Sequence, residues 1–179
     1  LSVKDLGDRR SPAPALLTRA PDQRGADIDN SYFEADALVG HVLSVSRANL
    51  HAYPEKKVSP GAVARVVELA VLRAAGEPLA YLLGNSFFGN RSFQIDRRGL
   101  IPRTKTEYLV READAFLKSL EQPGFLADWC KGSGCIAVTL LTDKPEWQAF
   151  AADSSLKALE VTQENAIRHG VKNRLQLLH

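Results

Sequence analysis

The chain has 179 residues, of which 45% are hydrophobic and 25% are charged, a composition that excludes fibrous and disordered proteins. Its net charge of +2 is too small to create the field of a nucleic-acid-binding protein, so no direct nucleic-acid contact is predicted. No apolar run approaches the roughly 20 residues that cross a bilayer, and two cysteines cannot build a disulfide framework. We therefore expect a cytoplasmic protein without a membrane partner, and no metal site is predicted.

The N-terminal part of the chain predicts a small helical bundle. Residues 1–28 mix prolines and charges without a period, which indicates a poorly ordered lead-in. Residues 29–76 form the predicted bundle, in which Ser31 with Glu34 makes a capping box and Ser59, followed by proline, begins a second amphipathic helix.

A linker follows at residues 77–103. Within it, alternation around a Gly-Asn pair in residues 87–95 predicts a β-hairpin. Thr104 with Glu107 then reads as another capping box, at the start of a long amphipathic helix that ends near Pro123.

Strands and helices alternate in residues 104–179, which we take as the first part of a Rossmann-like domain. Strand-like runs at 125–129, at a segment ending in Asp153 and at 174–178 are separated by helical stretches. Such βαβ units predict an α/β fold with a parallel sheet.

The turn after the first of these strands carries the candidate site. Gly132, Ser133 and Gly134 lie where the strand passes into a helix, which is where doubly wound folds place their cofactor. Glycine permits close backbone approach, and the helix N-terminus offers unpaired N–H groups. The alternative is a tight turn that needs glycine and binds nothing.

Asp153 closes the next strand about 20 residues later, from where an acid reaches the ribose hydroxyls of an adenosine-containing ligand. An acid at this place can also be only a helix N-cap. The two features together favour nucleoside binding.

Two cofactor classes fit the turn. Its glycines and Ala137 match the dinucleotide fingerprint, which keeps an NAD(P)-dependent oxidoreductase as an alternative. Asp128 favours the other class, because an acid four residues before the glycine pair looks like the acid-x-Gly-x-Gly-x-Gly form of S-adenosylmethionine-dependent methyltransferases. Cys130 stands in the place of the first glycine of that form.

Three segments carry a more specific resemblance: Gly-Glu-Pro-Leu-Ala-Tyr-Leu-Leu-Gly at 76–84, Phe-Phe-Gly at 87–89 and Leu-Ile-Pro-Arg at 100–103. With Ser59-Pro60 and Glu-Asn-Ala at 164–166, they resemble the peptide chain release factor glutamine methyltransferases. The resemblance covers about residues 30–179.

That resemblance implies a Rossmann-like methyltransferase domain that uses S-adenosylmethionine to methylate the glutamine side-chain amide in the Gly-Gly-Gln loop of a peptide chain release factor. It also implies that the helical domain docks this protein substrate. The implied cofactor-binding residues are Asp128, Cys130, Lys131, Gly132, Ser133, Gly134 and Asp153. The possible site wall comprises Arg103, Thr106 and Glu107, although Arg103 and Glu107 could instead form a local ion pair and a helix cap.

The sequence departs from the family at three places. Thr104-Lys105 replaces Pro-Glu or Pro-Asp, and Trp129-Cys130-Lys131 replaces Leu-Gly-Thr. The Asn-Pro-Pro-Tyr motif that holds the substrate amide would follow the next strand and is not in this sequence. Catalytic residues are therefore unassigned, and the methyltransferase domain is expected to be incomplete at its C-terminus. A degenerate, non-catalytic binding protein is the remaining alternative.

Overall fold

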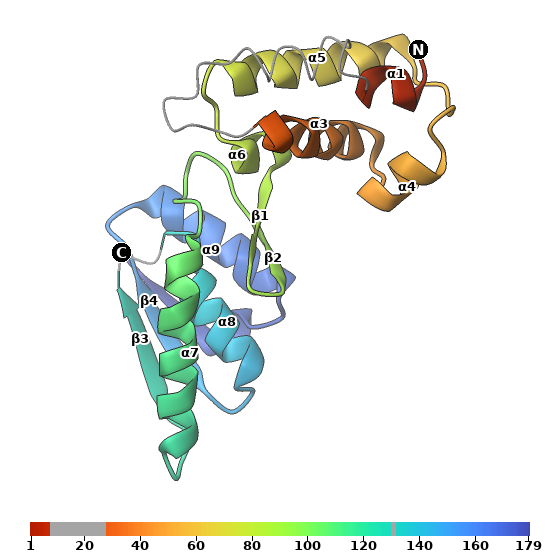
Figure 1. Cartoon of the computed structure of the whole chain (residues 1–179). Coiled ribbons are helices and arrows are strands. Elements are labelled where there is room, and N and C mark those ends of the chain that lie inside the picture. The colour runs from red at the N-terminus through yellow and green to blue at the C-terminus, as the bar shows by residue number, and fades with distance from the viewer. Residues whose placement is uncertain (8–27, 130–131) are drawn as a thin grey trace. The chain divides into compact units, whose positions relative to one another are not determined.

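A computed structural model describes residues 1–7, 28–129 and 132–179 (Figure 1). The chain divides into two compact units, Leu1–Leu83 and Gly84–His179. This boundary lies inside the predicted linker at 77–103, so the last helix of the first unit and the hairpin of the second share that segment. Within the described ranges, no helix has both the length and the apolar character needed to cross a bilayer.

The first unit is helical. Its elements are α1 (Val3–Gly7), α3 (Ile28–Leu43), α4 (Arg47–Ala52), α5 (Pro60–Ala74) and α6 (Leu79–Leu83). Helices α3 and α5 supply most of the core, in which Leu38, Val66 and Leu69 are at most 1% exposed. The amphipathic stripes predicted for these helices therefore face one another.

The two predicted helix starts in this unit had different outcomes. Ser59 caps α5, since its hydroxyl accepts a hydrogen bond from the N–H of Ala62 at 3.3 Å, which confirms the prediction. The capping box of Ser31 and Glu34 was wrong, because α3 begins at Ile28 and Ser31 lies inside it. The carboxylate of Glu34 instead binds the guanidinium of Arg73 on α5, at 2.8 and 3.0 Å.

The start of the chain differs from the predicted lead-in. Residues 3–7 form α1, whose Leu6 is 1% exposed and lies in the helical core. Backbone hydrogen bonds hold this segment, from Val3 N to Lys56 O and from Val58 N to Leu1 O, both at 3.0 Å. The rest of the predicted lead-in, up to residue 27, lies outside the described residues.

The second unit begins with the predicted hairpin. Strands β1 (Asn85–Phe88) and β2 (Arg91–Gln94) pair antiparallel, and Gly89 in the turn has a φ of 58°. Phe88 and Phe93 are buried edge to face, and the Phe93 ring packs on that of His169, with centroids 4.8 Å apart. The hairpin is thus attached to the helix that carries His169 at its end.

A parallel sheet forms the rest of this unit, which confirms the α/β class. Strands β3 (Phe125–Trp129), β4 (Gln148–Ala152) and β5 (Leu175–Leu178) lie in that order. Helix α7 (Thr104–Ser119) precedes β3, while α8 (Cys135–Asp143) and α9 (Leu156–Arg168) connect the strands, with a short 3₁₀ turn, Lys172–Arg174, before β5.

The two faces of this sheet differ in exposure. Asp128, Ala149 and Ala151 point to the face that the helices bury. Phe125 and Trp129 point the other way and are 63% and 70% exposed. Within the described residues, helices therefore cover one face of the sheet.

Candidate functional site

The glycine turn joins β3 to α8. Gly132 and Gly134 have φ values of 54° and 76°, a region that favours glycine, and Gly134 is the N-cap of α8. Gly134 is also required by packing, because a Cβ there would lie 2.5 Å from Cγ2 of Thr162 on α9. Of the predicted cofactor residues, Cys130 and Lys131 lie outside the described residues.

Asp128 lies on β3 and its side chain is directed to the start of α8. Oδ2 accepts a hydrogen bond from the N–H of Ala137 at 3.2 Å, and the residue is only 8% exposed. A carboxylate here satisfies one of the free donors of the helix and complements the positive end of its dipole.

Asp153 directly follows β4 and reaches the same turn from the neighbouring strand. Oδ2 accepts from the N–H of Gly132 at 3.1 Å, and Oδ1 accepts from the N–H of Ser155 at 2.9 Å. Ser155, not Asp153, is the N-cap of α9, so the simple capping role considered for Asp153 was wrong. Its carboxylate is half-buried and keeps lone pairs for further donors.

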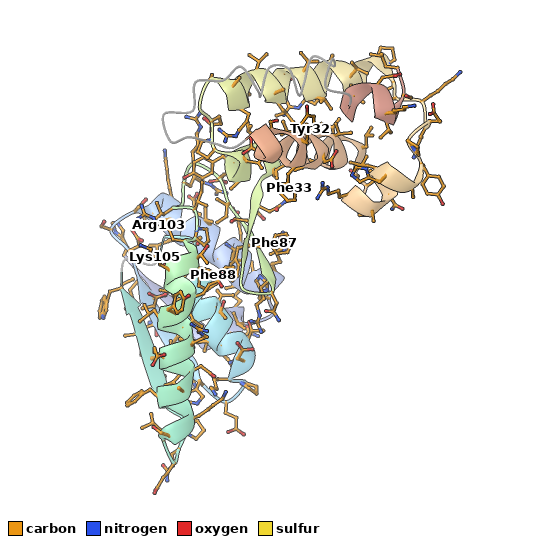
Figure 2. The ribbon with its side chains drawn as sticks, viewed as in Figure 1. Tyr32, Phe33, Phe87, Phe88, Arg103 and Lys105 are labelled. Atoms are coloured by element: carbon orange, nitrogen blue, oxygen red, sulfur yellow. The ribbon has the colours of Figure 1, made fainter. Side chains whose placement is uncertain are left out.

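The three residues of the predicted site wall all lie at the start of α7, in different surroundings. Arg103 is the exposed N-cap residue of α7, and Thr106 is half-buried in its first turn. Figure 2 shows Arg103 at the start of this helix. Glu107 accepts a hydrogen bond from the N–H of Gly89 at 3.0 Å. The capping box of Thr104 and Glu107 was wrong, since α7 begins at Thr104 without a side-chain cap and Glu107 contacts the hairpin turn.

Glu107 also lines a cavity of about 320 Å³ that the sequence did not indicate. One wall is Thr139 of α8, whose hydroxyl is buried and has no hydrogen-bond partner in the described part of the chain. Arg103 and Thr106 do not line the cavity. Its lining consists of Phe88, Gly89, Thr104, Glu107, Tyr108, Val110, Arg111 and Thr139.

Cys135, the first residue of α8, is close to the turn without being reactive. Burial raises the pKa of its thiol to about 11, against a smaller opposing effect of its hydrogen bond to Ser133. The thiol therefore stays protonated at neutral pH and is a poor nucleophile. No group of three or more potential metal ligands occurs in residues 1–7, 28–129 and 132–179.

Sequence reasoning missed two residues that contact the turn, Thr162 and Asn165 of α9. Both are fully buried, and they donate hydrogen bonds to the carbonyls of Gly132 and Ser133. Their spacing of three places them on the same helix face as the buried Val161 and Ala166. Polar residues within an apolar stripe were the available signal.

Comparison with known proteins identifies relatives over most of the chain. Residues 16–84 match the model of the PrmC N-terminal domain family. A release factor glutamine methyltransferase of Nitratidesulfovibrio vulgaris is 38% identical over 150 residues, which are 84% of this chain and 50% of that protein. The chain is a relative of the release factor glutamine methyltransferases. The resemblance drawn from the sequence segments is thereby confirmed.

Other release factor glutamine methyltransferases match to a similar degree. The protein of Cereibacter sphaeroides is 36% identical over 165 residues, covering 92% of this chain and 58% of its own. The protein of Chlorobaculum tepidum is 37% identical over 162 residues, covering 84% and 53%. The chain thus spans about half the length of the curated relatives that it matches.

Among solved structures, an O-methyltransferase family 2 protein from Planctomyces limnophilus aligns with 98% of this chain and 61% of its own. Its identity of 19% and TM-score of 0.31 are too low to define the fold.

Proposed function

We propose that this chain binds S-adenosylmethionine at the glycine turn and belongs to an enzyme that methylates the glutamine amide of a peptide chain release factor. The observation that carries the proposal is that two carboxylates from adjacent strands approach the connection between β3 and α8, which contains two glycines with positive φ. Asp153 accepts from Gly132 in the turn, and Asp128 accepts from Ala137 in the first turn of α8. The names of the relatives supply the reaction and the substrate class. On this proposal residues 104–179 belong to a Rossmann-like methyltransferase domain.

The hydrogen bonds at the turn favour S-adenosylmethionine over a dinucleotide. A pyrophosphate binds to free backbone N–H groups at the start of such a helix. Here the N–H of Gly132 is bonded to Asp153 and the N–H of Ala137 to Asp128. Two carboxylates would also repel the negative pyrophosphate, whereas they attract a sulfonium cation.

The reaction requires orientation more than activation by a base. When bound, the cofactor supplies a methyl group on a sulfonium that is open to direct displacement. An amide nitrogen is a poor nucleophile because its lone pair is delocalised, so the enzyme must align it with the methyl carbon. The contribution of the described residues is to bind and orient: Asp153 retains acceptor capacity for ribose hydroxyls, and the turn fixes its position. No described residue is assigned to the amide.

A titration tests the cofactor assignment. The full-length protein is titrated by calorimetry with S-adenosylmethionine, with its demethylated product and with NAD. We expect the first two to bind and NAD to bind far more weakly or not at all. Tighter binding of NAD would transfer the site to the oxidoreductase alternative, while cofactor binding without any methyl transfer would support a non-catalytic binding protein.

Asp153→Ala is the matching perturbation. Loss of hydrogen bonds to both ribose hydroxyls should weaken cofactor binding by about 1–3 kcal/mol. Asp143→Ala is the control, because Asp143 is another acid of the same unit, lies at the far end of α8 and pairs with Arg91 at 2.6 Å. Normal affinity of the Asp153 variant would show that this carboxylate only holds the backbone.

The helical unit is proposed as the docking module for the release factor. Its residues match the PrmC N-terminal domain, and the analogy with that family carries the proposal. Docking predicts that the full-length protein methylates an intact release factor with a much lower KM than a short peptide containing Gly-Gly-Gln. Equal KM values for the two substrates would leave the helical unit without this role.

A further inference from the structure

Helix α9 holds the backbone of the glycine turn through two buried polar side chains. Oγ1 of Thr162 donates to the carbonyl of Gly132 at 3.1 Å, and Nδ2 of Asn165 donates to the carbonyl of Ser133 at 3.0 Å. Both side chains belong to residues with no exposed surface. Two consecutive carbonyls of the turn are therefore bonded to one face of one helix.

These bonds matter because glycine leaves the turn without its own conformational preference. The N–H of Gly132 is held by its bond to Asp153, and the carbonyl of the same residue by the bond from Thr162. Gly132 is half-buried, and without the hydroxyl of Thr162 the turn would shift to a conformation in which the Gly132 carbonyl binds water or another donor. The restraint on the turn thus comes from outside it.

Asn165 extends the restraint to the hairpin. Its Oδ1 accepts from the N–H of Gln94 at 2.7 Å, and its Nδ2 also donates to the Gln94 carbonyl at 3.0 Å. With the bond to Ser133, both amide hydrogens are used. A single buried amide therefore connects the last residue of β2 with the glycine turn.

Neighbouring side chains also bond the end of β2, and the residues that follow it, to α9. Nε2 of Gln94 donates to Glu164 at 2.8 Å, and Glu164 also accepts from Arg98, which is bonded to Asp96. Arg98 keeps the pKa of the Asp96 carboxyl below its usual range, mainly through their hydrogen bonds. The segment that leaves the hairpin is thus anchored on α9, next to the residues that hold the turn.

We propose that Thr162 and Asn165 are positioning residues of the cofactor site, which keep the glycine turn in its binding-competent conformation and couple it to the β-hairpin. The inference rests on the proposed binding of S-adenosylmethionine at this turn. It assigns to α9 a role in cofactor affinity in addition to its packing on the sheet.

Thr162→Val is the sharpest test, because valine has nearly the same shape and removes only the hydroxyl. If the turn spends less time in the competent conformation, the apparent dissociation constant rises in inverse proportion to that fraction. In the full-length protein we expect S-adenosylmethionine to bind about tenfold more weakly, the size expected for one lost hydrogen bond. The KM for the cofactor should rise equally, while kcat at saturating cofactor changes less than about twofold.

Two further variants separate positioning from stability. Thr139→Val is the matched control, since Thr139 is a buried threonine on the adjacent helix whose hydroxyl has no partner among the described residues. It should bind S-adenosylmethionine normally. Thr162→Ser keeps the donor and should retain most of the affinity. A lowered melting temperature of Thr162→Val with wild-type affinity for the cofactor would overturn the proposal.

Asn165→Asp tests the second residue. Aspartate keeps an acceptor for the N–H of Gln94 and lacks the donors to the carbonyls of Gln94 and Ser133, so affinity should fall at least as much as in Thr162→Val. Should this variant fail to fold, Thr162→Val alone decides. If the wild-type protein does not bind S-adenosylmethionine, the proposed function fails; if it binds and the folded variants bind equally well, only the positioning role fails.

Discussion

Gly134→Ala should be strongly destabilising for two reasons that the structure separates. The first is conformational, because alanine at a φ of 76° costs about 1–2 kcal/mol relative to glycine. The second is steric, since the new Cβ would lie 2.5 Å from Cγ2 and 2.9 Å from Oγ1 of Thr162. Such contacts force neighbouring backbone or side chains to move, at a cost of about 1–3 kcal/mol. The expected total is about 2–5 kcal/mol.

Gly170→Ala is the matched control. Gly170 has a φ of 71° just after α9, and a Cβ there would meet no atom within 4 Å. It should lose only the conformational part, about 1–2 kcal/mol. The difference between the two variants then measures the overlap with Thr162.

Tryptophan fluorescence during urea unfolding suits this measurement, because both tryptophans of the chain, Trp129 and Trp147, belong to the second unit. Trp147 is 8% exposed, so its emission should change when this unit unfolds. Equal losses for Gly134→Ala and Gly170→Ala would refute the reasoning, because they would mean that α9 does not pack against the turn. The reasoning would be supported if Gly134→Ala lost more unfolding free energy than Gly170→Ala and this extra loss disappeared in a Thr162→Ala background.

Burial lowers the pKa of His169, whose Nε2 lies 3.1 Å from the carbonyl of Ser92. The imidazole of His169 therefore binds a proton more readily in the unfolded chain than in the folded one. The free energy of unfolding of the second unit should fall as the pH drops through about 6.5. In urea titrations at several pH values, His169→Gln should reduce this pH dependence. In the helical unit, Arg73→Met removes the two-point ion pair with Glu34 and should cost about 1–3 kcal/mol by circular dichroism. Arg65→Met, which removes an exposed pair, should cost less than about 0.5 kcal/mol, and equal costs would contradict the importance of burial.

Local signals explain which parts of the fold could be predicted. The hairpin follows from a Gly-Asn pair between alternating residues, and the start of α5 from Ser59 before proline. The parallel sheet follows from alternating strands and helices. For the hairpin and the start of α5, neighbours in sequence decide the structure. The sheet is different, because residues that pair in it, such as Phe125 and Gln148, are distant in sequence, and only the order of the elements predicts it.

Capping boxes failed where an acid had a stronger distant partner. Glu34 and Glu107 both stand three residues after a serine or threonine, as a capping box requires. Glu34 instead binds Arg73, 39 residues away, and Glu107 binds the N–H of Gly89, 18 residues away. A local pattern cannot reveal such partners.

Part of the candidate site could likewise be predicted from local spacing, and part of it could not. Gly132, Gly134 and Asp153 carry a recognisable spacing, and the structure brings them together. Thr162 and Asn165 are recognisable only as polar residues within the apolar stripe of α9, a pattern that does not reveal what they bind. Their role at the turn depends on how α9 packs against it, which only the tertiary structure specifies.

Strand β3 shows how the site relates to the exposed face of the sheet. Phe125, Ala127 and Trp129 lie on one face of this strand, and although all three are apolar, Phe125 and Trp129 are exposed within the described residues. The contacts described for the turn come from the other side and from the strand ends: from Asp153 after β4 and from α9. The conformation of the turn should therefore depend little on what covers the exposed face, because none of these contacts includes a residue of that face.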